Sequence, residues 1–168
     1  MKKTSLFIAV ASVALFGGAL LINNSSNNLN TASAQVENVK TQHDLEKLKF
    51  AKTKLDVPTK PAIIDEKTAI ENAKKAFSYF TKDAKEVTVE YHLMTNPEFE
   101  LFSEEALAKN PKLKEKKHMD QLPVYIVSFK GLSQLTSAPA GSKGDMITEN
   151  NIVVDAETGV ALMGFSYR

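Results

Sequence analysis

Four stretches of this 168-residue chain read as strands with a side-chain period of two, and that period most constrains the fold. The clearest is "EVTVEYHLMT", where Val87, Val89 and Tyr91 share one face while polar residues share the other. The other three are "LPVYIVSFKG", the segment 148–155 and the segment 160–167. Because successive side chains of a strand point to opposite faces, the pattern predicts an antiparallel sheet with one face covered.

One helix is expected to cover that face. The segment 65–80, "DEKTAIENAKKAFSYF", offers Asp65 as an N-cap and places Ile70, Ala73 and Phe77 along one side. Its alanines would let the helix lie close to a sheet. The sequence therefore predicts an α+β fold, a helix packed on a small antiparallel sheet.

The first 34 residues are interpreted as a targeting segment and not as part of the fold. Two lysines precede an uncharged apolar run over 6–22, and Ala32-Ser33-Ala34 fits the small-x-small pattern of a signal-peptidase site. Cleavage between Ala34 and Gln35 is the favoured interpretation. The alternative is an uncleaved anchor, because the apolar run approaches the length of a membrane span. Both interpretations place the remainder outside the cytoplasmic membrane, as a secreted or membrane-anchored protein.

Beyond this segment the sequence predicts two regions. Residues 35–61 form a charged, partly helical linker, and residues 62–168 form the α+β domain. Two connections in the domain, 96–121 and 131–147, are long enough to be functional or mobile loops.

The linker is expected to contain a helix over 42–55. Thr41 and Asp44 resemble a capping box at its start, and leucines follow near helical spacing. Pro58 and Pro61 then mark the boundary of the compact domain.

Composition excludes several function classes. The chain has no cysteine, so it can form no disulfide and carries no thiol nucleophile or lipid-modified cysteine. Lys and Arg number 21 and Asp and Glu 20, so there is no basic excess to bind nucleic acid.

Three segments together resemble the PepSY family: "KTAIENAKKAF", "LPVYIVSF" and "IVVDAETGVAL". Members of that family read as a helix, a strand pair, and then a "V-D-A-x-T-G" turn. The resemblance extends over about residues 65–162 and is interrupted by the two long connections. It implies a cystatin-like helix-on-sheet domain in an exported or membrane-anchored bacterial protein, without catalytic residues, that binds or restrains peptidases. In that case Asp155, Thr158 and Gly159 are a structural signature, the hairpin that closes the sheet.

Catalytic candidates are few. His92 shares a strand face with Glu90 and could act as a general base, but an exposed or hydrogen-bonded strand residue is the favoured interpretation. His43 and His118 lie in charged surroundings and are expected to be solvated. No histidine pair has metal-ligand spacing, and Ser142 lies in a glycine loop without a suitable partner.

The one asymmetric charge feature is the run from Lys109 to His118. It could make a weak contact with an anionic envelope surface, although a solubilising loop is the favoured interpretation.

These observations predict an exported, non-catalytic binding module, a regulator or inhibitor of a secreted or envelope peptidase. The partner would be a protein, and no catalytic, metal-binding or cofactor-binding residues and no cofactor are expected. Two alternatives stay open: a small extracytoplasmic hydrolase that uses His92 and Glu90, and an envelope-anchored structural protein.

Overall fold

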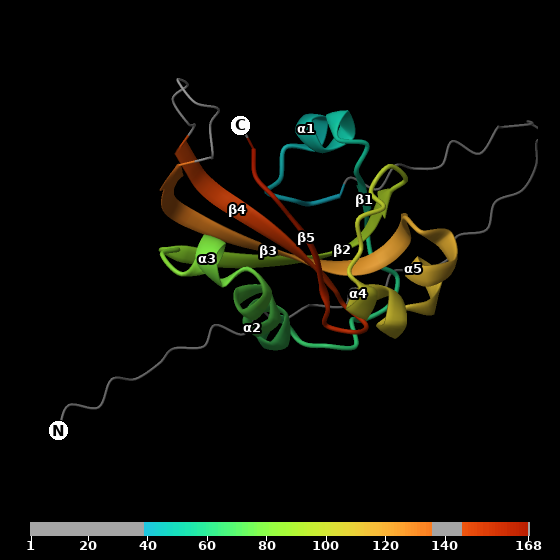
Figure 1. Ribbon diagram of the computed structural model, residues 1–168. Coiled ribbons are helices and arrows are strands. Elements are labelled where there is room, and N and C mark those ends of the chain that lie inside the picture. The colour runs from blue at the N-terminus through green and yellow to red at the C-terminus, as the bar shows by residue number, and fades with distance from the viewer. Residues whose placement is uncertain (1–38, 136–145, 168) are drawn as a thin grey trace, which may run out of the picture. The chain divides into compact units, whose positions relative to one another are not determined.

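A five-stranded antiparallel sheet organises the part of the chain that the structure, a computed structural model, describes, residues 39–135 and 146–167. The strands lie in chain order, so each one pairs with its neighbour in sequence. Figure 1 shows the sheet between helices on both of its sides. The elements are, in chain order, α1 Leu45–Phe50, β1 Lys54–Asp56, α2 Glu66–Ala76, α3 Ser78–Thr81, β2 Glu86–Asn96, α4 Glu104–Lys109, α5 Pro111–Lys116, β3 Met119–Leu135, β4 Met146–Asp155 and β5 Ala161–Phe165. The predicted α+β class is confirmed.

The register of the central strands assigns side chains to the two faces. Tyr91 of β2 lies opposite Tyr125 of β3, which lies opposite Val154 of β4. These three side chains therefore share one face of the sheet. Their neighbours His92 and Val124 share the other face, because side chains alternate along a strand.

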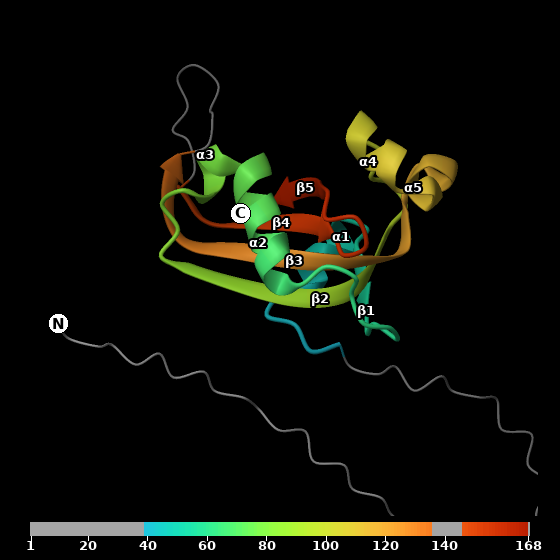
Figure 2. The ribbon, with the colours of Figure 1, turned by 90° about the horizontal axis from the view of Figure 1, so that it is seen from below.

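Helix α2 packs on the first face, as the sequence predicts. The Asp65 carboxylate accepts a hydrogen bond from the Thr68 N–H and caps the helix. Ala69 and Ala73 are fully buried, which brings the helix close to the sheet (Figure 2). The predicted helix is interrupted at Phe77, where the backbone leaves the helical region before the short α3 begins.

The opposite face is also covered, and here the expectation of a single covered face is wrong. A second apolar cluster contains Leu48 of α1, Leu55 of β1 and Leu113 of α5, together with buried side chains of the central strands. Figure 1 shows α1 and α2 on opposite sides of the sheet. Apolar residues of a half-buried strand indicate which side is apolar, but they cannot show what a distant segment places on the other side.

The segment 39–56, part of the expected linker, contributes to the sheet and the core. Helix α1 is shorter than predicted, because Lys52 takes a left-handed conformation (φ 55°) and the chain then enters β1. Its N-cap is Asp44, whereas Thr41 is hydrogen-bonded to Glu90 of β2. The expected capping box is therefore replaced by a single cap and a tertiary contact.

The two long connections contain more regular structure than expected. The segment 96–121 includes both α4 and α5, and Ser103 and Asn110 cap them through their side chains. Strand β3 extends to Leu135 and β4 begins at Met146, while the residues between them lie outside those described. Among the residues that the structure describes, no helix has the length and apolarity needed to cross a membrane.

Candidate functional site

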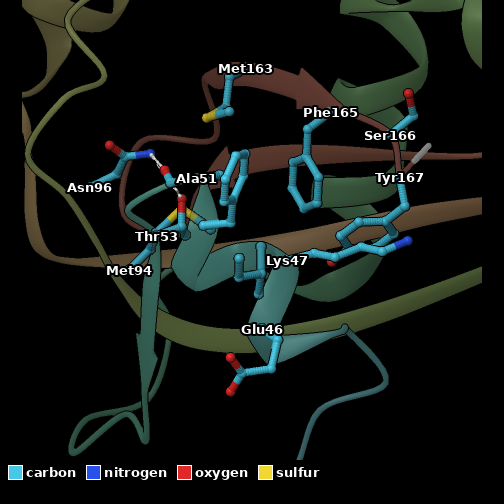
Figure 3. A pocket seen from close by; sticks show the side chains of 12 residues that line it. Glu46, Lys47, Ala51, Thr53, Met94, Asn96, Met163, Phe165, Ser166 and Tyr167 are labelled. Atoms are coloured by element: carbon cyan, nitrogen blue, oxygen red, sulfur yellow. Dashed lines mark hydrogen bonds between the residues drawn. The ribbon is translucent and has the colours of Figure 1, made fainter.

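A largely apolar pocket of about 610 Å³ lies between α1 and the C-terminal strand (Figure 3). Helix α1 forms one wall, and β5 with the residues that follow it forms the other. Figure 3 shows the rings of Phe165 and Tyr167 side by side, with Lys47 of α1 beside the Tyr167 ring. Six apolar or aromatic side chains provide most of the lining: Leu48, Phe50, Met94, Met163, Phe165 and Tyr167.

Phe50 places an exposed aromatic side chain at the edge of this pocket. Its side chain is 89% exposed although it lines the pocket, whereas Leu48, on the same helix, is buried in the core. A large aromatic side chain gains nothing from such exposure in the isolated molecule, and exposed apolar groups at a concave surface are typical of binding sites.

Strand β5 forms the edge of the sheet beside this pocket. Among the described residues it pairs only with β4, through contacts such as Val153 with Met163 and Val154 with Ala161. The outer edge of such a strand presents backbone N–H and C=O groups that another strand can pair with.

A second, more open hollow of about 580 Å³ adjoins the start of the same strand. Its lining is shared between the two clusters: Phe77 and Ala161 pack with the cluster under α2, whereas Phe102, Val160 and Leu162 pack with the cluster on the α1 side. Strand β5 therefore has an apolar pocket on its α1 side and a second, more polar hollow beside its first residues.

Next to the pocket, residues 41–44 cross the sheet as a strap that leads into α1. Glu90 of β2 holds this strap: its carboxylate accepts hydrogen bonds from the Thr41 hydroxyl at 2.5 Å and from the Gln42 N–H at 2.8 Å. The Gln42 side chain donates to the Thr88 hydroxyl at 2.6 Å and accepts from the Lys130 ammonium group. Four hydrogen bonds thus fix two consecutive residues to β2 and β3.

His92, the predicted catalytic candidate, contributes to the same network. Its Nε2 lies 2.9 Å from the Glu90 carboxylate, and its side chain is buried, with 4% exposed. It is a hydrogen-bonded strand residue, one of the two forms that the sequence predicts, and it is not exposed. Burial acts to raise the pKa of Glu90, but hydrogen bonds from Thr41, His92 and Gln42 outweigh it and hold that pKa below its usual range.

The prediction that His43 is solvated is wrong. His43 belongs to the strap, and its ring points from the strap toward the sheet, so that the residue is only 5% exposed. The centroid of the ring lies 5.9 Å from that of Phe165 and 6.1 Å from that of Tyr167. Burial lowers the pKa of His43, opposed in part by the carboxylates of Glu90 and Glu149. Charged sequence neighbours suggest a surface, but here the fold buries the ring against residues more than 120 positions away.

Several buried polar atoms on this face have no hydrogen-bond partner among the described residues. They include both ring nitrogens of His43, Nδ1 of His92 and both side-chain amide atoms of Asn151. Asn151 stands opposite Ser128 of β3 and Phe165 of β5, so these groups lie on the face that the strap covers. Each unpaired buried group costs about 1–3 kcal/mol unless water bonds to it.

The arrangement of Glu90 and His92 suits holding the strap better than hydrolysis. Both Glu90 oxygens already accept hydrogen bonds from the strap, and His92 lines neither the pocket beside α1 nor the second hollow. Ser128 on the same face is fully buried and receives a 3.5 Å contact from Gln42, and the Thr41 hydroxyl is itself bonded to Glu90. A substrate would have to displace the strap to reach this pair.

The hairpin signature is a buried junction of three elements. The Asp155 carboxylate accepts from the N–H groups of Glu157 and Thr158 at 2.8 and 3.0 Å, and from the Asn110 amide at 2.6 Å. Asn110 is also the N-cap of α5, so Asp155 connects the β4–β5 turn to that helix. Gly159 has φ +76°, and its carbonyl accepts from Asn72 of α2 at 2.8 Å.

The basic run is helical and not a loop. Residues 111–116 form α5, and within the run Lys109 pairs with Glu105 and Lys116 with Asp120. His118 lies outside the strap network, half-buried at the end of this run. The predicted cleavage residues Ala34 and Gln35, and Ser142, lie outside the described residues.

Within residues 39–135 and 146–167, no group of three or more histidine and carboxylate side chains is arranged to hold a metal ion. No protein-family model, curated protein or solved structure matches the chain. The PepSY resemblance therefore rests on the sequence motifs alone.

Sequence reasoning missed the pocket, although one signal was present. Met163, Phe165 and Tyr167 alternate along the predicted strand 160–167 and provide one wall. The opposite wall comes from α1, which the sequence assigns to a linker, so its contact with the C-terminal strand could not be predicted.

Proposed function

We propose that this protein is a non-catalytic binding module that receives an extended segment of a partner protein along the outer edge of β5. The observation that carries the proposal is that edge itself, with an apolar pocket on its α1 side and a second hollow beside its first residues.

The geometry of the edge indicates how such a segment would be recognised. An added strand gains affinity from main-chain hydrogen bonds and specificity from pockets that accept alternate side chains. Side chains of the added strand would point in turn to the α1 side and to the α2 side. A segment that presents apolar side chains to the α1 side therefore fits this edge best.

The sequence motifs support a class of partner. The resemblance to the PepSY family favours an exported peptidase or another envelope protein, which this module would restrain or assist. The N-terminal segment supports a location outside the cytoplasmic membrane, with cleavage before Gln35, and N-terminal sequencing of the native product tests that location.

Two exposed apolar residues provide a direct test with a matched control. A photo-crosslinking phenylalanine analogue replaces Phe50 at the pocket, or Ile63, which is 75% exposed and lines neither hollow. Neither position is buried, so both variants should fold. An adduct with an exported protein is expected from position 50 and not from position 63, and equal labelling from both positions would contradict the proposal.

The same pair tests the kind of segment bound. Decapeptides are selected from a random displayed library on the purified protein, and their affinities are measured by fluorescence anisotropy. Selected peptides should contain extended apolar stretches and should bind Phe50→Ala about tenfold more weakly, a loss of about 1.4 kcal/mol. Binding to Ile63→Ala should be unchanged; selected peptides indifferent to Phe50 would place the site elsewhere.

A further inference from the structure

The strap of residues 41–44 is connected directly to one wall of the pocket. Its last residue, Asp44, caps α1, and α1 contributes Leu48 and Phe50 to the pocket lining. A change in the position of the strap therefore changes the position of that wall.

The strap is held by two contacts of different kinds. Thr41 and Gln42 are hydrogen-bonded to β2 and β3, mainly through Glu90. His43 is inserted under the strap against Phe165 and Tyr167, which themselves line the pocket. The His43 ring thus lies between the strap and the pocket wall that β5 provides.

The buried position of the His43 ring is compatible with the neutral imidazole and unfavourable for the protonated one. Neither of its nitrogens has a hydrogen-bond partner among the described residues, so an added proton would find no acceptor in place. Burial makes a charged imidazolium costly, whereas the same ring in water accepts a proton readily.

The charged and titratable groups that face this ring come from the three central strands. Glu90 and His92 stand on β2, Lys130 on β3 and Glu149 on β4. The two carboxylates favour a protonated ring, and the ammonium group and the second imidazole oppose it. On the strap and α1, Asp44 follows His43 directly in the chain and Lys47 lies over the Tyr167 ring, which itself packs against the His43 ring.

We propose that the strap is an acid-released latch on the pocket: protonation of His43 expels its ring from beside Phe165 and Tyr167, frees residues 41–44 from the sheet and displaces α1. The inference depends on the proposed function only for what the latch controls. At neutral pH the latch is closed and the pocket is formed. At mildly acidic pH the α1 wall moves away and the site at β5 is altered.

The direction of the pH dependence follows from proton linkage. The pKa of His43 is lowered by burial from its ordinary value of 6.5, so the open state binds the proton more tightly than the closed state. The equilibrium constant for closing the latch is therefore largest above pH 6.5. It falls by up to tenfold for each pH unit below that value. The pKa of Glu90 is held below 4.5, so Glu90 keeps its charge while His43 titrates.

A buried thiol can report whether the latch is open. The chain has no cysteine, so Ser128→Cys provides a single thiol at a fully buried position of the face under the strap. Val127→Cys is the matched control, equally buried on the opposite face under α2. The labelling rate with 4,4′-dithiodipyridine is measured between pH 7.5 and 5.0 and divided by the rate for the unfolded chain at the same pH.

The normalised rate for Ser128→Cys should rise about tenfold on acidification, and that for Val127→Cys should stay constant. His43→Phe, which keeps an aromatic ring that cannot be protonated, should abolish the rise. Amide hydrogen exchange of wild-type residues 41–51 should accelerate over the same pH range. A flat rate for Ser128→Cys, a rise that persists with His43→Phe, or a parallel rise for Val127→Cys would overturn the latch. No partner is present in these measurements, so their failure is separate from failure of the proposed edge site.

Discussion

Asp155 and Asn110 form a buried pair whose exchange tests how the turn of the hairpin is fixed to α5. The Asn110 amide donates to the Asp155 carboxylate at 2.6 Å, and both side chains are buried. The same carboxylate also accepts two N–H groups of its own turn. Asp155→Asn places an amide group where an acceptor is needed, so two donors face each other.

The size of the effect follows from this geometry. A hydrogen bond to a charged group contributes about 1.5–3 kcal/mol, and a buried donor left unpaired costs about 1–3 kcal/mol. We expect Asp155→Asn to lower the free energy of unfolding by about 2 kcal/mol. Asn110→Asp should cost about 3 kcal/mol, because it brings two carboxylates together in a buried site.

The double exchange should restore the pair. With Asn at 155 and Asp at 110, the amide at 155 donates to the carboxylate at 110, which can still cap α5. We expect the double variant to be within about 1 kcal/mol of the wild type, a coupling well above the roughly 0.5 kcal/mol typical of independent sites.

Urea unfolding followed by far-ultraviolet circular dichroism measures all four proteins, with the m-value as a check that two-state unfolding is retained. Additive losses in the double variant, with no rescue, would refute the assignment of this hydrogen bond as the link between the turn and α5.

Three further predictions concern single positions. Gly159→Ala should cost about 2 kcal/mol, because the backbone has φ +76° and a Cβ would lie 2.8 Å from the Asn72 amide nitrogen, which donates a hydrogen bond to the Gly159 carbonyl; urea unfolding measures the loss. Burial raises the pKa of Tyr167 to about 12, so one tyrosine should titrate near that pH in the absorbance at 295 nm, and Tyr167→Phe should remove that late step. The neutral phenol is favoured in the folded state, so the stability that it contributes should be lost as the pH rises above 10. Phe50→Ala should change the free energy of unfolding by less than about 0.5 kcal/mol, since the ring is almost fully exposed, and a larger loss would mean that Phe50 serves the core and not a partner.

The sequence alone determined the local elements of this protein. The period of two located strands β2 to β5, and Asp65 marked the start of α2, because these signals depend on residues only a few positions apart. The turn after Asp155 was readable for the same reason, since its hydrogen bonds join neighbours and Gly159 supplies the positive φ.

The tertiary structure decided what those elements enclose. The strap is fixed to Glu90 by a contact between residues 48 positions apart, and Asn110 reaches Asp155 across 45 positions. The sequence does not show that these residues pair, because each polar side chain could equally well form its hydrogen bonds with water. The burial of His43 and the pocket beside β5 likewise arise only when the chain returns across its own sheet and brings α1 to the C-terminal strand.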